Sequence, residues 1–242
     1  MDRESIARRP CFLCVANLPP EQRGLAWGEG FTLLCNPFPI VERHLTIVHR
    51  EHRPQQIEGQ VGTMLDLAAA LPGFFTVYNG PQCGASAPDH LHLQAGLRDE
   101  LPIVRETAGK AGPAIETYGV RALLLRGPDR SQVVDETERA LALLSAVTGK
   151  EPEPWCNVAA WAEPESGFSL VLYPRSRHRP DAFHTGELAV SPATIDMSGI
   201  LVAPFARDFE CLSGDDAAAV YREVTIPQDQ FRDVLARLES RC

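Results

Sequence analysis

Long apolar runs are missing from this chain of 242 residues, and lysine is scarce. No stretch approaches the roughly 18 apolar residues that mark a membrane-spanning helix, and Met1 does not begin a signal-peptide pattern. The sequence therefore predicts a cytoplasmic protein with no membrane partner. Lys110 and Lys150 are the only lysines; this is a bias of composition, from which no functional conclusion follows.

Positive charge is also in deficit. The formal net charge is −9 and the pI is about 5.3, which argues against a general nucleic-acid binder. The charge does not argue against a nucleotide, because one local loop suffices to hold a phosphate. The seven cysteines are scattered except for one pair, which fits a reducing compartment better than a disulfide framework.

The most informative segment runs from Asn79 to Gln94 and reads NGPQCGASAPDHLHLQ. A β-prone apolar run precedes it, so we expect a strand, a glycine-rich loop and a second strand. Alternate residues of a strand share a face, so His90, His92 and Gln94 are expected in one row. Such a row suits phosphate, with an imidazole as nucleophile and loop N–H groups around the oxygens. The alternative is a solvent-facing strand with ordinary alternation.

Apolar periodicity predicts an α+β fold of mostly antiparallel strands with helices packed on one face. Strands are expected near residues 31–35, 45–48, 74–78, 90–95, 120–125, 156–161, 168–173 and 200–202. Helices are expected around residues 57–68, 134–147 and 231–238. The stretch 98–118, with charges, glycine and proline, is expected to be a linker.

Cys11 and Cys14 form a CxxC pair close to the start of the sequence. Such a pair is either half of a zinc site or a redox pair. A redox pair is expected between a strand and a helix, whereas this one runs into a proline-containing turn, which favours a metal. Zinc needs two more ligands, which histidine supplies most readily; the candidates are His44, His49, His52 and His90.

The pattern Gly-x-Ser-x-Pro-x-His-x-His-x-Gln, from Gly84 to Gln94, resembles a known signature. It is similar to that of galactose-1-phosphate uridylyltransferases, diadenosine tetraphosphate phosphorylases and GDP-hexose phosphorylases, all in the histidine-triad superfamily. The resemblance implies that His92 attacks the α-phosphorus and carries the nucleotidyl group covalently. It also implies that Gln94, in place of a third histidine, marks the transferase and phosphorylase branch.

The same resemblance implies further substrate contacts. Asn36 matches the ribose-binding position, although an Asx turn into Pro37 is an equal alternative. Asn79 and the loop residues Gly84, Ala85 and Ser86 are expected to surround the phosphate. A basic cluster in the second half attracts a second phosphate or is simply a solvated turn; its members are Arg175, Arg177, His178 and Arg179.

For the metal, the resemblance implies a closed structural zinc site made by Cys11, Cys14, His52 and His90. His49 is the main rival of His52, and His44 matches a histidine with a structural role. The alternative is a site without metal, in which the two cysteines are simply buried.

A short internal repeat supports a two-part chain. Residues 45–54 and 169–180 each read as an apolar run, a basic turn and His-Arg-Pro, with Asn36 and Asn157 upstream. This matches the two half-repeats of uridylyltransferase-like proteins. We expect residues 1–97 to be a catalytic histidine-triad-like repeat with the zinc site, 98–118 a linker, and 119–242 a degenerate second repeat. In this second repeat, the segment that corresponds to the His90–Gln94 motif falls near residues 197–203, which contain no histidine.

The resemblance implies a nucleotidyltransferase or phosphorylase that acts on a nucleotide sugar or dinucleoside polyphosphate, with phosphate as a second substrate. The alternatives are a histidine-triad nucleotide hydrolase and a non-catalytic nucleotide-binding protein. Relatives usually carry an extra segment before the cysteine pair, so a substrate-contacting piece is expected to be absent. The sequence leaves a homodimer open and does not specify the base, the sugar or the acceptor.

Overall fold

The computed structural model describes residues 8–163 and 166–240, so the ends of the predicted 1–97 and 119–242 repeats lie outside the described ranges. The described residues form one nine-stranded sheet in the order β1-β2-β3-β5-β4-β8-β9-β7-β6. Every neighbouring pair in it is antiparallel. The strands are β1 (Gly24–Trp27), β2 (Phe31–Cys35), β3 (Leu45–His49), β4 (Phe74–Asn79), β5 (His92–Leu97), β6 (Ala114–Thr117), β7 (Val120–Gly127), β8 (Cys156–Glu163) and β9 (Gly167–Pro174).

The sheet contains one hairpin–helix–hairpin order twice. The first unit is β2, β3, α2 (Val61–Ala70), β4 and β5, and the second is β6, β7, α4 (Arg130–Thr148), β8 and β9. Their strand orders, β2-β3-β5-β4 and β6-β7-β9-β8, are equivalent. The units join where β4 pairs with β8, from Phe75 opposite Trp161 to Asn79 opposite Asn157. We call this pairing the β4–β8 seam.

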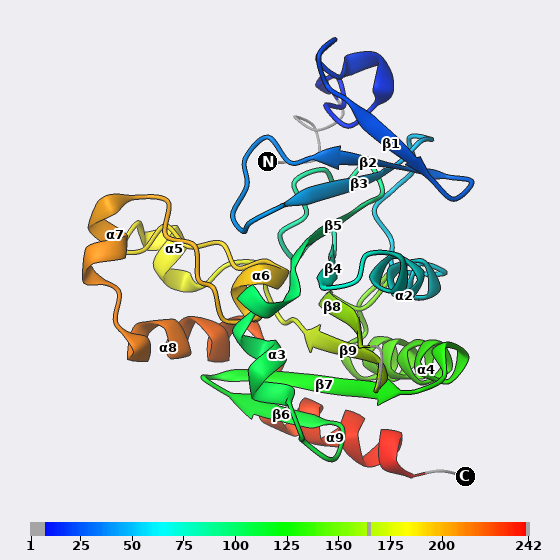
Figure 1. Ribbon diagram of the computed structural model, residues 1–242. Coiled ribbons are helices and arrows are strands. Elements are labelled where there is room, and N and C mark those ends of the chain that lie inside the picture. Colours follow the sequence, from blue (N-terminus) through cyan, green and yellow to red (C-terminus); the bar gives the residue numbers. More distant parts are fainter. Residues whose placement is uncertain (1–7, 164–165, 241–242) are drawn as a thin grey trace.

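Helices cover both faces of the sheet, as Figure 1 shows. On one side, which we call the α2 face, the apolar sides of α2, α4 and α9 (Gln228–Glu239) bury one core. On the other, the α6 face, a second core takes residues from α3 (Pro102–Thr107), α6 (Thr194–Met197) and α8 (Gly214–Val224). The shorter elements are η1 (Val15–Asn17), η2 (Arg98–Glu100), α5 (Asp181–Thr185) and α7 (Ala206–Cys211).

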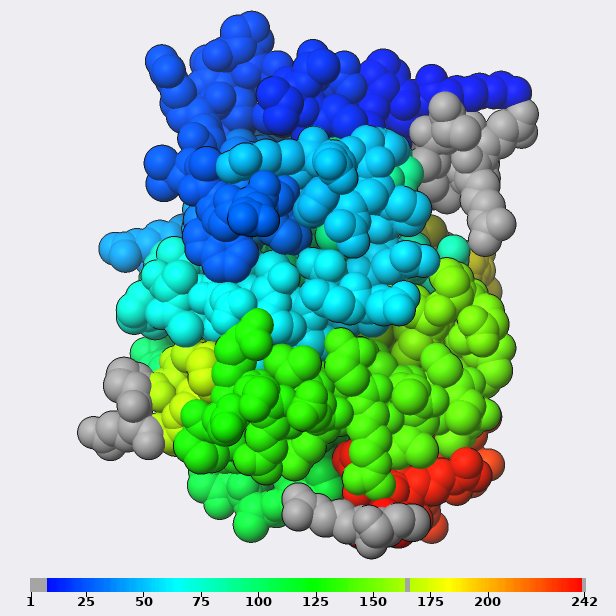
Figure 2. Space-filling view, turned by 90° about the vertical axis from the view of Figure 1, so that its right-hand side faces the viewer, coloured from blue at the N-terminus to red at the C-terminus, as the bar shows by residue number. Residues whose placement is uncertain are grey.

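The strands of the first unit occupy one end of the sheet and those of the second unit the other end. Figure 2 looks onto the α2 face, where the colours pass from blue at the top through cyan and green to red at the bottom. The first unit therefore makes the upper part of this face and the second unit the lower part. No helix among the described residues combines the length and apolar character needed to cross a bilayer.

The α+β class is confirmed, with three local corrections. Helices pack on both faces of the sheet, since each face presents an apolar core. Residues 200–202 form no strand; they follow α6 without a sheet partner. The stretch 98–118, expected as a linker, holds η2, α3 and the outermost strand β6.

The alignment of the two repeats is also corrected. In the sheet, β9 of the second unit occupies the position that β5 occupies in the first. The internal sequence repeat had instead predicted that residues 197–203 correspond to the His90–Gln94 motif. The topology also puts Asn157 in β8, the counterpart of β4, and not opposite Asn36, which follows β2. The division into repeats at 97 and 119 stays a prediction.

Candidate active site and metal centre

β5 divides its side chains between the two faces of the sheet. Leu93 and Ala95 join the core of the α2 face. Gln94 pairs with Val77, which packs in the core of the α6 face, so His92 and Gln94 face that side. His90 is not part of this row: it precedes β5 and turns toward the N-terminal segment. His92 is also more enclosed than a solvent-facing strand residue, with 2% of its surface exposed.

The tautomer of His92 is set by the backbone. Its Nδ1 donates to the carbonyl oxygen of His90 at 2.8 Å, so Nε2 carries the lone pair. This Nε2 is buried and has no hydrogen-bond partner among the described residues. Burial lowers the pKa of His92 from its ordinary value, which favours the neutral ring. A neutral imidazole with a free, oriented Nε2 is the form that a nucleophile requires.

Gln55, which the sequence analysis did not single out, holds the ends of β4 and β5 together. Its Nε2 donates to the carbonyl oxygens of Asn79 at 2.9 Å and His92 at 3.0 Å. Its Oε1 accepts the backbone N–H of His92 at 2.8 Å. The side chain is 1% exposed. Gln55 therefore closes the gap in the strand ladder where the glycine loop leaves the sheet, and it fixes the backbone of His92.

The orientation of Gln94 is fixed by His44. The Nδ1 of His44 accepts the N–H of Ile40 at 3.1 Å, so its Nε2 bears the proton and donates to Gln94 Oε1 at 2.8 Å. Burial lowers the pKa of His44, which keeps this ring neutral. The amide NH₂ of Gln94 then points away from His44 and remains a donor for a ligand oxygen.

Asn79 lies at the β4–β8 seam and is oriented in a similar way. Its Oδ1 accepts from Asn157 Nδ2 at 2.9 Å and from the backbone N–H of Thr194 at 2.8 Å. The backbone donor fixes which amide atom is the oxygen, so Nδ2 faces away from these groups. Asn157 comes from β8 and Thr194 from α6, and the sequence alone offered no signal that they meet Asn79.

The glycine loop between β4 and β5 is tightly built. Gly84 has φ +98°, and a Cβ there would lie 2.7 Å from the Cβ of Ala193, so only glycine fits both the conformation and the space. The N–H of Ala85 points back to the Gly80 carbonyl oxygen at 3.3 Å. Ser86 is exposed at the end of this turn. The predicted phosphate contacts therefore rest mainly on Ser86 and the neighbouring backbone, with Ala85 already engaged.

Asn36 forms the Asx turn that was the alternative to ribose binding. Its Oδ1 accepts the backbone N–H of Phe38 at 2.9 Å, and its Nδ2 lies 3.5 Å from His44 Nε2. The oxygen is thus occupied locally, and a contact of Asn36 with ribose stays a prediction that relies on Nδ2.

The predicted metal ligands Cys11, Cys14, His52 and His90 come together. Their ligand atoms all lie within 4.8 Å of one another. The Sγ of Cys11 is 3.3 Å from His90 Nδ1, and the Sγ of Cys14 is 3.3 Å from His52 Nδ1. Two thiolates and two imidazoles at this spacing fit a closed tetrahedral site of the kind zinc occupies.

A hydrogen bond behind His90 and an ionic contact behind His52 orient the two rings. His90 Nε2 donates to the carbonyl oxygen of His49 at 2.7 Å, and His52 Nε2 lies 3.8 Å from Asp89. Each ring thus turns Nδ1 toward the thiols, as partners behind metal-bound histidines do. His49, the rival ligand, contributes only its backbone oxygen, and its Nδ1 accepts the N–H of Glu51 at 3.2 Å.

Comparison with known sequences finds one family model and similar proteins of one kind. A family described as a domain of unknown function (DUF4922) matches residues 1–97. The chain is 27% identical over 137 residues to the galactose-1-phosphate uridylyltransferase of Lactiplantibacillus plantarum, covering 55% of this chain and 26% of that protein. It is 25% identical over 240 residues to the GDP-D-glucose phosphorylase 1 of Bos taurus, covering 89% of this chain and 60% of the relative. The chain thus spans about a quarter and three fifths of these two proteins.

Solved structures agree with the fold. The yeast Ap4A phosphorylase matches with a TM-score of 0.65 at 20% identity, covering 92% of this chain and 83% of that chain. Its complex with Ap4A matches with a TM-score of 0.58 at 20% identity, covering 82% and 74%. The resemblance to the uridylyltransferase and phosphorylase branch is confirmed by these matches.

Proposed function

We propose that this chain is a nucleotidyltransferase of the phosphorylase type that carries the nucleotidyl group on His92. The observation that supports it most is the buried Nε2 of His92, which has no partner among the described residues while Nδ1 is held by the His90 carbonyl oxygen. A buried, unpartnered polar atom costs free energy, so its presence argues for a ligand or reaction that uses it. The named relatives, a uridylyltransferase and two phosphorylases, favour nucleotidyl transfer as that reaction.

The proposed reaction has two displacements at phosphorus. In the first, the Nε2 lone pair of His92 attacks the α-phosphorus, an N–P bond forms, and the P–O bond to the leaving phosphate breaks with its electron pair on that oxygen. In the second, an oxygen of an incoming phosphate attacks the same phosphorus and the N–P bond returns its pair to Nε2. Nδ1 keeps its proton throughout, because it donates to a carbonyl oxygen.

The neighbouring side chains provide positioning. In this proposal the NH₂ groups of Gln94 and Asn79, which are oriented by His44 and by the β4–β8 seam, donate to phosphoryl oxygens. Phosphoryl transfer depends mainly on such positioning and on stabilising charge. In this proposal the metal centre is structural zinc, since its four ligands leave no position for substrate.

Gln94 favours transfer over hydrolysis. A carboxamide donates and accepts hydrogen bonds but cannot act as an acid or a base near neutral pH. A third imidazole in its place would help to activate water. With Gln94 the nucleotidyl-His92 should persist until an ionised acceptor such as phosphate arrives. The donor is a nucleotide sugar or a dinucleoside polyphosphate, the classes named by the relatives and by the Ap4A complex of the yeast enzyme.

The test is a screen of labelled nucleoside diphosphate sugars and diadenosine polyphosphates, with and without phosphate. We expect acid-labile label to accumulate on the protein without phosphate and to leave as a nucleoside diphosphate when phosphate is added. His92→Asn should take up no label, whereas the exposed His184→Asn should behave as wild type. Release of a monophosphate at the same rate without phosphate would identify a hydrolase, and the absence of label with every donor would refute the nucleotidyl-His92 intermediate.

A further inference from the structure

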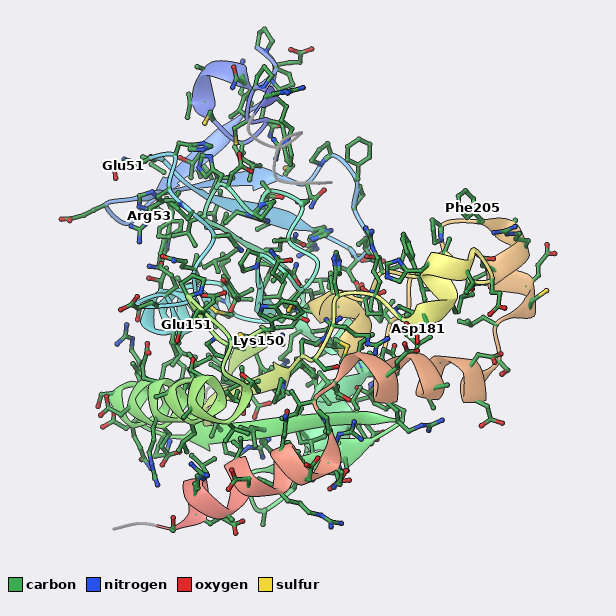
Figure 3. All side chains as sticks on the ribbon, turned by 180° about the vertical axis from the view of Figure 1, so that it is seen from behind. Glu51, Arg53, Lys150, Glu151, Asp181 and Phe205 are labelled. Carbon is green, nitrogen blue, oxygen red and sulfur yellow. The ribbon has the colours of Figure 1, made fainter. Side chains whose placement is uncertain are left out.

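A large cavity adjoins the glycine loop. It measures about 900 Å³ and is lined by the loop residues Gly84, Ala85 and Ser86 and, from the chain after β9, by His178, Arg179 and Ser191. This volume falls in the range of small-molecule sites. Figure 3 labels Glu151, after α4, and Asp181, at the start of α5, on two of the chain segments that border it.

The turn that brings Arg179 into this wall is anchored by a buried guanidinium. Arg175 is 1% exposed, and its NH2 donates to the carbonyl oxygens of Arg177 at 3.1 Å and His178 at 2.9 Å. Its Nε donates to Val224 at 3.2 Å, and its NH1 donates to Asn157 at the β4–β8 seam. The backbone of residues 177 and 178 is therefore held rigidly against the site.

Arg179 is fixed in place but has no acidic partner. Its Nε donates to Ser191 Oγ at 3.0 Å, and Ser191 Oγ lies 3.1 Å from His178 Nε2. Its guanidinium stacks over the Phe183 ring at 4.0 Å from the centroid. Within residues 8–163 and 166–240 no carboxylate lies at ion-pair distance from it, and nothing accepts from its NH1 and NH2 groups. The edge that binds oxyanions in a bidentate way is thus unused.

The three acidic residues in the cavity wall form no ion pair with the Arg179 guanidinium. Asp89 pairs with Arg9 at 2.9 Å, and Glu153 accepts from the Tyr78 hydroxyl at 2.6 Å and the Ile57 N–H at 2.7 Å. The third acid, Glu151, is exposed. By contrast, the nearby Arg177 is neutralised by Asp181 at 2.6 Å and Glu223 at 2.7 Å.

We propose that Arg179, held by Ser191 and Phe183, forms an oxyanion subsite for the phosphate group that leaves or attacks the phosphorus on His92. This rests on the proposed function for the identity of the ligand. Because the two displacements are the reverse of one another in geometry, the leaving phosphate of the donor and the acceptor phosphate occupy the same place. In this proposal the phosphate occupies the cavity that is lined by both Arg179 and the glycine loop.

Calorimetric titration of the intact protein with inorganic phosphate tests the subsite without any turnover. Loss of charge-assisted hydrogen bonds should weaken phosphate binding roughly tenfold to a hundredfold in Arg179→Gln. The matched control Arg177→Gln should bind within about twofold of wild type. The phosphate affinity of Arg179→Lys, which keeps the positive charge but loses the paired N–H donors of the guanidinium, should lie between those of the other two variants. Thermal unfolding checks that each variant is folded. If Arg179→Gln does not fold, the comparison of Arg179→Lys with Arg177→Gln still tests the subsite.

The outcomes separate the subsite from the chemistry of His92. Equal phosphate affinity in the Arg179 and Arg177 variants, or no phosphate binding by the wild type, overturns the subsite even if labelled nucleotide is trapped on His92. Phosphate binding that requires Arg179 supports the subsite even if no donor labels His92, in which case the proposed function fails alone.

Discussion

Gln55 shows how one buried amide can position a reactive group without touching the substrate. Its three hydrogen bonds join the end of β4 to the start of β5 and clamp the peptide that carries His92. Next to His92, the glycine loop that connects these strands does not continue the backbone hydrogen bonds between β4 and β5. The position of the His92 ring therefore depends on Gln55 as well as on β5.

Replacing Gln55 by alanine should lower both stability and the rate at which His92 is labelled. The change leaves three buried backbone groups without partners, which should cost about 2 to 4 kcal/mol. Urea unfolding measures the stability, and donor titrations of the labelling reaction should show a lower rate constant with little change in donor affinity. The neighbouring Gln56→Ala is the control, since Gln56 is half-buried and bonds to no described residue. A normal labelling rate in Gln55→Ala would show that the clamp does not position His92.

His178 gives the molecule a specific sensitivity to acid. Burial, followed by the nearby charges of Arg179 and Arg175, lowers the pKa of His178 to about 4 from its ordinary 6.5. Between about pH 6.5 and about pH 4 the unfolded chain binds a proton at this histidine and the folded chain does not. The free energy of unfolding is therefore highest above pH 6.5 and falls as the pH drops toward 4. Because His178 is only partly buried, we expect a loss of about 1 kcal/mol between about pH 7 and about pH 5.

The measurement is urea unfolding at both pH values in wild type and in His178→Gln. The variant should lose about 1 kcal/mol less than wild type over this interval, while the exposed His184→Gln should follow wild type. An identical pH dependence in wild type and His178→Gln would contradict the assignment.

For single residues, alternation along a strand predicted that His92 and Gln94 face the same side. The family resemblance implied the cluster of Cys11, Cys14, His52 and His90 that the structure assembles. The alternation misplaced His90, because the period of two applies only within a strand and His90 precedes β5. Gln55, Thr194 and Asn157 were missed because each acts through hydrogen bonds to residues far away in the sequence.

Among the elements, the N-terminal segment around η1 depends most on the metal centre. Its apolar support is a small cluster that includes Leu13, Leu34 and Val48. Cys11 and Cys14 tie this segment to His52 and to His90, directly upstream of β5. A metal bound by these four residues would hold the segment against the strand that carries His92.

Purified protein prepared without chelator should contain about one zinc ion per chain, as a closed four-ligand site implies. Changing Cys11 and Cys14 together to serine should remove it and make the N-terminal segment sensitive to limited proteolysis. Metal analysis and protease digestion measure the two effects. The exposed Cys35→Ser and Cys211→Ser should keep the metal, and metal-free wild-type protein would refute the zinc site.

Seven of the nine strands were expected close to their observed limits, because their apolar runs are buried in one of the two cores. β1 and β6 were missed. Both are short and outermost in the sheet, and their side chains are largely exposed, so they lack the apolar pattern that identifies a strand.

At the level of the whole molecule, the class of fold was predictable and the pairing of the halves was not. Local periodicity reveals strands and helices, whereas the β4–β8 seam joins residues about 80 positions apart and has no local signal. The chance similarity of two His-Arg-Pro turns misaligned the repeats, since one turn follows β3 and the other follows β9.

The seam has a consequence for any attempt to work with one half of the chain. In the intact sheet, β4 is an interior strand that is buried along most of its length and paired on both sides. Cutting after residue 97, where the matched family segment ends, would leave the backbone of residues 75–79 as an unprotected sheet edge beside apolar side chains. Such edges recruit other strands and promote aggregation. We therefore expect the first half, expressed alone, to aggregate, because β8 covers the edge of β4 in the intact sheet.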